Sequence, residues 1–595
     1  MRDRVVTRLV RLYLDNPPLG SYNVDAMYLR VTKRTRKDGS AVEYVQLAHN
    51  YRDPKTGFPK PEILYTFGRK DELDLDALRR LVRSICRFLE PGEVEEIQRQ
   101  LGEEWAFEFL GARQLGGAWF LDKLWQKLGI GTTLKRLLKD RNYRRPIERL
   151  IFAMVANRAL NPSSKLAMET WVANEVLIDG LPEVEVHQLY QAMDFLLEAS
   201  ETIQHDVFFS VANLFNLEVD LIFLDTTTTY FEIEGEDQDT CAEDGTASEK
   251  GLRKRSKNDK DNHPELAHVV IAFAVTRTGI PVRCWVWPGD ESAQNLVEQV
   301  KRDLNGWTMG RVILVTDAGF NSQKNRRILQ GAGGHYIVGE KMRQGHCGLP
   351  VDALRRPGTY KMLDNGLKIK EVVVGDGEAR RRFVVVINPV EAERDRKKRE
   401  DITREVERRL DELKQLDGEP HTKAACALRS HPVYGRYIRQ TKTGKLKLNK
   451  GKMRSEAHFD GKFLISTPDD TLSTDDTVMG YKQLAEIERV FRDLKHTIDI
   501  RPVFHRLPDT IKAHVLLCWL AMLLIRIAEQ ETDETWQSIL TALQPLQMGI
   551  CRTASGEPWQ TSPITKAQRD LFTKLSLKPP PKYYKPPTPR SCKMS

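Results

Sequence analysis

The order of apolar runs between residues 219 and 331 limits the possible folds most strongly. Short runs rich in branched aliphatic residues are typical of buried strands. The chain has four such runs: Val219–Leu224, Leu266–Val275, Thr278–Trp287 and Arg311–Thr316. The sequence TRTG joins the second and third as a hairpin, and helical patterns follow at Glu291–Leu304 and Gln323–Gly331. This order predicts an α/β fold in which helices pack on a mixed sheet.

Three acidic residues stand where such a fold would place a catalytic site. Asp225 ends the first run, Asp317 ends the fourth, and Glu488 lies in the helical pattern YKQLAEIERVFRDLK. A carboxylate at the C-terminal end of a buried strand faces solvent or a ligand. Hard cations such as Mg²⁺ take oxygen ligands, and two ions about 3.5–4 Å apart can activate an attacking oxygen and stabilise a leaving one. These three residues are therefore candidate catalytic residues and metal ligands.

The helical pattern around Glu488 places this carboxylate beside an apolar face. At about 100° per residue, one stripe of a single expected helix holds Tyr481, Leu484, Glu488, Arg492 and Lys495. An apolar face beside it holds Leu484, Ile487, Phe491, Leu494 and Ile498. Glu488 is thus expected at the border between core and cleft. An ordinary amphipathic helix with an exposed row of ion pairs explains the same pattern.

Basic residues are clustered. Lys+Arg 92 against Asp+Glu 83 gives a net charge of +9. Basic runs occur at Arg30–Lys37, Lys250–Lys260, Arg396–Arg399 and Arg439–Arg454. One such run alone indicates a solvated loop, whereas four of them in a chain with a candidate metal site favour contact with a phosphate backbone. A phosphate backbone is therefore the expected partner.

Cysteine spacing and apolar segments indicate a cytoplasmic protein. The eight cysteines form no CxxC pair, which is typical of a reduced compartment. The N-terminus lacks the apolar stretch of a secretory signal, so no export is expected. The apolar stretch Val515–Ile525 is shorter than the roughly 20 residues that span a bilayer. We therefore expect a buried helix there and no membrane partner.

Changes of pattern along the chain predict six regions. Residues 1–73 form a small basic β-containing region with an antiparallel sheet at Met27–Phe67, and residues 74–216 form a helical domain with helices at Phe120–Leu138, Ile147–Ala159 and His187–Glu198. The core would occupy 217–334 and 467–545. A β-rich insertion at 335–466, with a charged helix at Glu391–Leu416, would interrupt it, and 546–595 would end in a disordered tail from Lys578.

The acidic residues lie in motifs that resemble a known family. LDTTTTYFE, VTDAGFNS and the spacing Y-x₆-E-x₆-K, in this order, resemble the catalytic blocks of bacterial insertion-sequence transposases of the DDE type, specifically the insertion-sequence-four superfamily. The likeness covers about residues 215–530. Leu484 stands where the family has an arginine, unless Arg489 or Arg492 takes that role. The predicted strand order is also that of a ribonuclease H-like core.

The resemblance implies a function. Asp225, Asp317 and Glu488 would bind two Mg²⁺ ions, with Mn²⁺ as a substitute, and cut the ends of an insertion sequence before strand transfer into target DNA. Tyr481, Arg492 and Lys495 would contact DNA near the scissile phosphate. Since two ends must be cut and joined, a homodimer in a synaptic complex is expected. Residues 74–216, together with the basic N-terminal segment, are candidates for binding the DNA ends.

Two other functions fit the same residues. A ribonuclease H-like nuclease without strand transfer would keep the fold and the metal ligands. A catalytically degenerate DNA-binding protein would keep the acidic residues only by descent. The intact set of Asp225, Asp317 and Glu488 argues against the second alternative, and joining of cut ends to a plasmid distinguishes a transposase from the first.

Overall fold

The chain folds into two compact units. In the computed structural model the described residues are 27–35, 41–53, 59–74, 77–78, 81–82, 108–139, 141, 143, 145–217, 219–233, 235–241, 248–256, 263–307, 312–331, 334–342, 353–376, 380–501, 503, 505–552 and 557–584. The first unit comprises Met1–Ala112, Met548–Ser562 and Pro581–Ser595, and the second comprises Arg113–Gln547 and Pro563–Pro580.

Two sheets lie wholly or mostly in the first unit. The expected N-terminal sheet is confirmed as β1 (Met27–Thr35), β2 (Ala41–Arg52) and β3 (Pro59–Arg69), followed by the short helix η1 (Lys70–Glu72). In the second sheet the order is β20 (Tyr583–Tyr584), β19 (Trp559–Thr561), β18 (Gln547–Arg552) and β4 (Glu108–Gln114). The expectation of a disordered tail from Lys578 is therefore wrong for residues 578–584, because β20 pairs with β19. Residues 585–595 lie outside the described residues.

A mixed sheet of nine strands forms the centre of the second unit. Its order is β12 (Lys361–Met362), β13 (Lys368–Val374), β14 (Arg381–Ile387), β17 (Lys462–Thr467), β11 (His335–Gly339), β10 (Ile313–Thr316), β5 (Leu221–Phe231), β8 (Ala267–Val275) and β9 (Pro281–Pro288). Strands β5, β10 and β11 are parallel, and β8 and β9 continue the sheet as the expected hairpin. A short pair, β6 (Thr240–Cys241) and β7 (Ser248–Glu249), lies outside this sheet.

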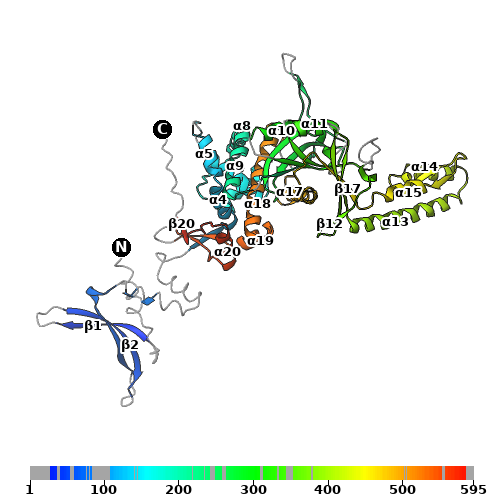
Figure 1. Ribbon diagram of the computed structural model, residues 1–595. Coiled ribbons are helices and arrows are strands. Elements are labelled where there is room, and N and C mark those ends of the chain that lie inside the picture. Colours follow the sequence, from blue (N-terminus) through cyan, green and yellow to red (C-terminus); the bar gives the residue numbers. More distant parts are fainter. Residues whose placement is uncertain are drawn as a thin grey trace. The chain divides into compact units, whose positions relative to one another are not determined.

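Helices cover both faces of this sheet (Figure 1). On one face lie α9 (Ser200–Leu214), α10 (Ala293–Asn305) and α11 (Gln323–Gln330), packed on Ile222, Leu224 and Leu314. The opposite face carries α16 (Thr474–Lys482), α17 (Ala485–His496) and α18 (Pro508–Thr532). Side chains alternate between faces along a strand, so even-numbered residues of β5 meet α10 and odd-numbered residues meet α16 and α17.

The helices of residues 113–217 belong to the same compact unit as the sheet. They are α4 (Gly116–Lys127), α5 (Ile130–Leu137), α6 (Ile147–Leu160), α7 (Lys165–Asn174), α8 (Val186–Glu198) and α9. The single helix expected over Phe120–Leu138 is broken at Gly129, whose φ of 72° is left-handed and ends α4. Because α18 packs against α6 and α8, the separate helical domain expected at 74–216 is corrected to one shared core.

The helix α18 is the central helix of this core. Its length and composition would allow it to cross a membrane, and 94% of its most apolar stretch is buried inside the protein. The buried helix expected at Val515–Ile525 is confirmed. After it, α19 (Trp536–Leu543) and α20 (Lys566–Lys574) return to the helical region, where Phe572 contacts Phe120 with ring centroids 5.9 Å apart.

The boundary expected at residue 335 is not a domain boundary. Strand β11 pairs with β10, and β17 pairs with both β11 and β14, so strands assigned to an insertion extend the core sheet. The excursion from the sheet is shorter: residues 389–457, called the arm below. It holds α13 (Pro389–Leu413), α14 (Gly418–Ser430), η7 (Gly435–Tyr437), β15 (Ile438–Gln440), β16 (Leu446–Leu448) and α15 (Lys450–Ala457).

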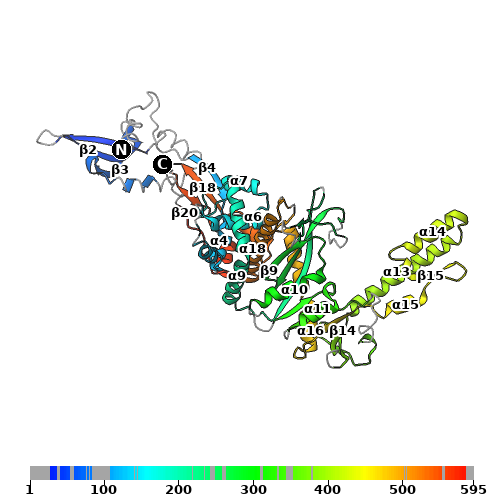
Figure 2. The ribbon, with the colours of Figure 1, turned by 90° about the horizontal axis from the view of Figure 1, so that it is seen from above.

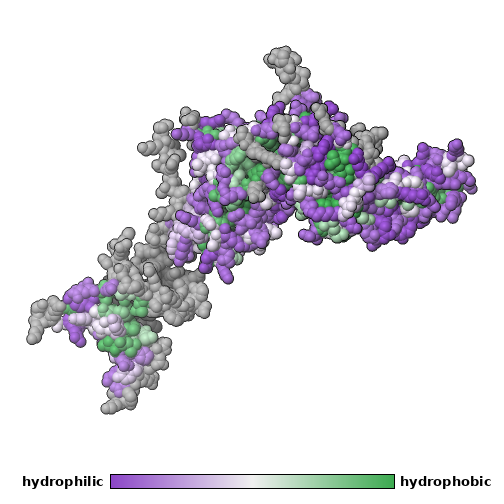
Figure 3. Space-filling model, viewed as in Figure 1, coloured by the Kyte–Doolittle hydropathy of each residue, from purple (hydrophilic) through white to green (hydrophobic). Residues whose placement is uncertain are grey.

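The arm is mainly helical and has a small core of its own. Its elements lie together in both ribbon views (Figures 1 and 2). The core consists of Val406, Leu410 and Leu428, with hydrophobic residues of β15 and β16 packed against it. The charged helix expected at Glu391–Leu416 is thus buried at Val406 and Leu410. Hydrophilic residues dominate the arm's visible surface (Figure 3).

Candidate active site

Two of the three candidate acids lie side by side on the sheet. Strands β5 and β10 are parallel, with Leu224 paired to Thr316, so Asp225 and Asp317 are the next residues in register. Adjacent strands lie about 4.8 Å apart, and paired residues of parallel strands point to the same face. The sequence prediction that the two aspartates approach each other is supported by this register.

The position of Asp225 within its strand differs from the prediction. The sequence predicts that Asp225 ends a strand, but β5 continues through Thr226–Thr229 to Phe231 and pairs with β8 along that length. The four threonines are buried strand residues, as β-branched side chains favour. The parallel partner β10 stops at Thr316, so the edge that exposes Asp225 is created by its neighbour rather than by its own strand.

Both aspartates face α16 and α17. Leu221, four residues before Asp225 on the same face of β5, has its Cδ1 2.9 Å from where a Cβ on Gly480 of α16 would lie. Phe273, the cross-strand partner of Asp225, contacts Phe491 of α17 with ring centroids 5.9 Å apart. The face that carries the aspartates is therefore the face that the Glu488 helix covers.

Tyr481 occupies the space beside Asp317. In the parallel register, Gly339 of β11 is the next residue in the row that starts with Asp225 and Asp317. A Cβ on Gly339 would lie 2.2 Å from the Tyr481 hydroxyl, so only glycine leaves room for it. Burial, and then the negative charges of Asp317 and Glu488, raise the pKa of Tyr481 to about 12. Its hydroxyl therefore stays protonated at neutral pH and can donate a hydrogen bond.

The helix around Glu488 is shorter than expected. The stripe from Tyr481 to Lys495 requires one continuous helix, but α16 ends at Lys482 and α17 begins at Ala485, with Leu484 between them. Tyr481 and Glu488 consequently lie on different helices. Glu488 is exposed in the first turn of α17. Of the predicted apolar face, Ile487, Phe491, Leu494 and Ile498 are buried and Leu484 is partly buried, and Val490 is buried as well.

A buried arginine fixes α17 against α18. Arg526 of α18 is 3% exposed and contacts Glu486 at 3.3 Å and Glu529 at 2.9 Å. Arg489, one possible replacement for the family's arginine, lies 3.7 Å from the same Glu529. Arg492 is exposed on α17 and Lys495 is partly buried there. Of the two possible replacements, Arg492 is therefore the one more open to a DNA phosphate.

Glu488 and the aspartates do not form one ligand cluster. Within the described residues, no group of three or more His, Cys, Asp or Glu side chains is placed to hold a metal ion. Asp225 and Asp317 nonetheless offer hard oxygen donors in adjacent positions, which is the donor chemistry that Mg²⁺ prefers. The aspartate pair thus fits a shared divalent ion, and Glu488 lies on the same side of the sheet.

Sequence reasoning missed the residues that shape the loop after Asp317. The Asp317 carboxylate accepts a hydrogen bond from the Gly319 N–H at 2.8 Å, at the start of η4 (Ala318–Phe320). The Asn321 side chain donates to the Gly339 carbonyl at 2.8 Å and thereby ties this loop to β11. The glycine that ends the apolar run HYIVG was the available signal, because a glycine at a strand end often marks a close approach.

Two family models match the chain. One, described as a transposase DDE domain, matches residues 237–524, a range that contains Asp317 and Glu488 but begins after Asp225. The chain is a DDE transposase. The second model, described as the N-terminal domain of IS1634 family transposases, matches residues 29–96, which include β2, β3 and most of β1. The two matches, in this order, place the chain among the insertion-sequence transposases and establish DNA transposition as its function.

The other comparisons add little. A cryo-EM structure of the piggyBac transposase synaptic complex with hairpin DNA matches with 10% sequence identity and a TM-score of 0.32, over 72% of this chain and 78% of that chain. At this level of similarity it carries no argument about the present site. A search of curated protein sequences found no match.

Proposed function

We propose that the chain cuts DNA at insertion-sequence ends and transfers the freed strand to target DNA at a two-metal site made by Asp225, Asp317 and Glu488. The strand order β9-β8-β5-β10-β11 supports a ribonuclease H-like core under this site. The observation that carries the proposal is the parallel register that sets Asp225 beside Asp317 on the face covered by α17. Insertion-sequence superfamily four remains our prediction for the finer classification.

Each acid has a distinct place in the proposed site. Asp225 and Asp317 present adjacent carboxylates from a rigid sheet, which suits ions shared between them. Glu488, exposed on α17, supplies the third carboxylate when the helix meets the bound ions and DNA. Mg²⁺, or Mn²⁺ in its place, would lower the pKa of the attacking water or 3′-hydroxyl and neutralise charge on the leaving oxygen.

Basic side chains around the sheet suit a DNA backbone. Arg492 and Lys495 lie one and two turns beyond Glu488 on α17, and each can contact a phosphate near the cut. Tyr481, whose hydroxyl is enclosed beside Gly339, is better placed to orient Asp317 than to stack on a base. Two chains holding two ends in a synaptic complex remain the expected assembly.

The variant Asp317→Asn tests the proposed site. The substitution keeps the size of the side chain but removes the charge that binds a cation. We expect Mg²⁺-dependent cleavage of a duplex bearing the element's end to fall by at least about 100-fold, while binding of that duplex is retained. Cleavage is measured on labelled duplexes with and without Mg²⁺, and joining is measured by transfer to a plasmid.

A matched aspartate provides the control. Asp364 is exposed in the turn between β12 and β13, away from the row of Asp225, Asp317 and Gly339. Asp364→Asn should cut at the wild-type rate. Normal cutting by Asp317→Asn would refute the assigned role, and cutting without joining by the wild type would favour a nuclease.

A further inference from the structure

A cavity lined by cations lies in the helical part of the second unit. Its volume is about 350 Å³, and residues of α6, α7 and α8 line it together with His505, which precedes α18, and His514 of α18. The lining includes Arg158 and Lys165. These four basic residues are 3% (Arg158), 4% (Lys165), 7% (His505) and 3% (His514) exposed. None of the candidate catalytic residues lines this cavity.

Neither Arg158 nor Lys165 forms an ion pair with a carboxylate among the described residues, although the negative charge of Asp499 acts on Arg158. Arg158 donates to the backbone carbonyl oxygens of Ser163 and, at 3.4 Å, Asp499, both neutral acceptors. Its Nε has no hydrogen-bond partner among those residues. Lys165 is in none of the ion pairs found in the described part of the chain. Burial, and then the charge of Arg158, lower the pKa of Lys165 to about 7.

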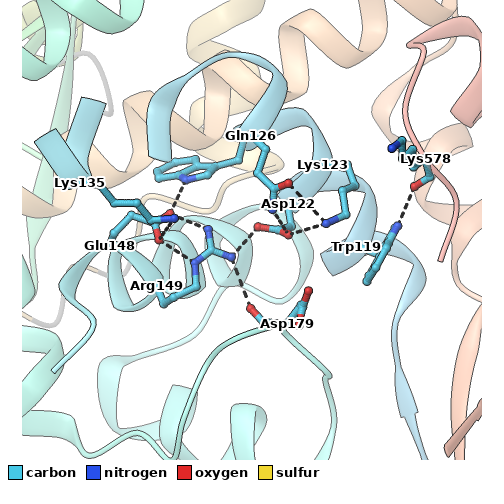
Figure 4. Close-up of polar contacts among 10 residues, drawn as sticks. Trp119, Asp122, Lys123, Gln126, Lys135, Glu148, Arg149, Asp179 and Lys578 are labelled. Atoms are coloured by element: carbon cyan, nitrogen blue, oxygen red, sulfur yellow. Dashed lines mark hydrogen bonds and ion pairs between the residues drawn. The ribbon is translucent and has the colours of Figure 1, made fainter. Parts of the chain in front are cut away.

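A partly buried arginine on the same helix shows how a cation in the protein interior is ordinarily paired. Arg149, on the same helix α6, contacts Asp122 at 2.6 Å and Glu148 at 2.5 Å (Figure 4). Trp125 donates a further hydrogen bond to Glu148 at 2.8 Å. A buried cation is ordinarily stabilised by such partners, and an unpaired one costs several kcal/mol. An anion in the cavity around Lys165 would therefore be stabilised by its surroundings.

The start of α7 adds donors to the same cavity. Ser164 caps this helix by accepting a hydrogen bond from the Ala167 N–H at 3.1 Å, and Lys165 is the first helical residue. Ser163, Ser164 and Lys165 all line the cavity. Helix N-termini carry unpaired N–H groups and partial positive charge, both of which favour anions. Arg158, Lys165, two imidazoles and the start of α7 thus surround one space.

We propose that this cavity binds a phosphate group, either as orthophosphate or as a phosphate of a DNA strand. Lys165 supplies a point charge, the Arg158 guanidinium supplies a second positive charge, and the Ser164 hydroxyl supplies a further donor. A single phosphate fits within the cavity volume. Tyr190 also lines the cavity and is 37% exposed. Its ring meets the His505 ring edge to face, with ring centroids 6.0 Å apart. A nucleotide attached to the phosphate would meet this aromatic ring.

Calorimetric titration of the full chain with sodium phosphate, at constant ionic strength, tests the proposal. We expect one saturable site, at least tenfold weaker binding by Lys165→Met, and retained binding by Lys165→Arg. Lys135→Met is the matched control, because Lys135 is a 70% exposed lysine of α5 outside the cavity. Circular dichroism establishes that each variant is folded, and Lys165→Arg keeps the test informative if Lys165→Met does not fold.

Absence of a saturable phosphate site in the wild type, or equal binding by Lys165→Met, would overturn the proposal. Competition then assigns the source of the phosphate. An oligonucleotide that displaces orthophosphate only when it carries a 5′-phosphate indicates a strand end, and displacement by the 5′-hydroxyl form as well indicates internal phosphates. Orthophosphate binding that neither oligonucleotide disturbs indicates a free anion. The result is independent of Asp317, so it is separable from the cleavage test.

Discussion

Gly339 has no side chain at the position where the Tyr481 hydroxyl enters the row of Asp225 and Asp317. A Cβ there would lie 2.2 Å from that hydroxyl and 3.3 Å from the Ala318 nitrogen, beside the loop that follows Asp317. Gly339→Ala should therefore lower the free energy of unfolding by about 1–3 kcal/mol, the usual cost of overpacking, and should slow cleavage. Urea unfolding and duplex cleavage measure the two effects.

A second substitution tests whether the loss of stability in Gly339→Ala comes from the clash with the Tyr481 hydroxyl. Tyr481→Phe removes the clashing oxygen, so the double variant should recover part of the stability that Gly339→Ala removes. Gly306→Ala is the control, because its nearest neighbour would lie at 3.6 Å. Equal destabilisation at Gly339 and Gly306 would contradict the close approach of Tyr481.

Lys165 makes stability depend on pH. Its pKa falls to about 7 in the folded chain from the ordinary 10.5, so between these values the unfolded chain binds more protons. The free energy of unfolding contributed by this group therefore rises with pH through that window. Below pH 7 the lysine is charged in both states, and the full cost of burying its ammonium group applies. Lys165→Met should raise the free energy of unfolding by about 1–4 kcal/mol near pH 6.5, in phosphate-free buffer, and by much less near pH 10.

Urea unfolding of both chains at the two pH values measures this difference. Lys135→Met, which removes an exposed lysine, should give the same small change at both. A gain from Lys165→Met that does not vary with pH would show that the lysine is fully charged, or fully neutral, throughout.

At the scale of elements, the arm contains two basic segments that differ in how many acidic partners they have. The arginines of α13 are paired along the helix: Arg396 with Glu393 and Glu400, and Arg408 with Glu405 and Glu412. The segment from Arg439 to Arg454, which spans β15, β16 and the start of α15, has seven basic residues, Arg439, Lys442, Lys445, Lys447, Lys450, Lys452 and Arg454, and no acidic ones. This segment therefore carries net positive charge that a phosphate backbone can use.

Replacement of Lys445, Lys447 and Lys450 by glutamine should weaken DNA binding. All three side chains are exposed. For each phosphate that a lost lysine no longer neutralises, the slope of log affinity against log salt concentration becomes shallower by about 0.9. Fluorescence anisotropy at several salt concentrations measures both the affinity and this slope. The matched triple replacement of Arg396, Arg404 and Arg408, which are all ion-paired on α13, should change them less. Equal effects of the two sets would contradict this division of the arm.

At the scale of the whole molecule, the C-terminal part of the chain is built into structures that begin far away in sequence. The helix α20 packs on α4 through Phe572 and Phe120, and Lys574 donates to the Thr532 carbonyl at 2.6 Å. The Trp119 indole donates to the Lys578 carbonyl at 2.9 Å. The segment that contains α20 is thus part of the helical core rather than an appendage.

A chain that ends at Ser562 should consequently be less stable. Removal of Phe572 alone costs about 3–5 kcal/mol by the usual value for a buried phenylalanine, so the free energy of unfolding of the truncated chain should fall by at least that much. Urea unfolding measures this change. Phe572→Ala is the matched control and should reproduce part of it. An unchanged unfolding midpoint in the truncated chain would contradict the packing of α20.

Local sequence patterns determined the strands and helices around the site. Apolar runs of β-branched residues end close to the observed limits of β8, β9 and β10, and the period of the α17 pattern identifies its buried face, because these signals depend on neighbouring residues alone. The basic N-terminal sheet and the buried helix at Val515–Ile525 followed for the same reason. The motifs around Asp225, Asp317 and Glu488 indicated the transposase family.

Only the tertiary structure decided which distant segments share a sheet and a core. Nothing local indicates that β17 pairs with β11, that β10 stops where β5 continues, or that Gly339 makes room for Tyr481, because each depends on a partner more than 90 residues away. The break between α16 and α17 and the cluster of cations around Lys165 have the same origin. Pairing and burial are properties of the assembled chain, so the sequence supplies the groups and packing determines which of them meet.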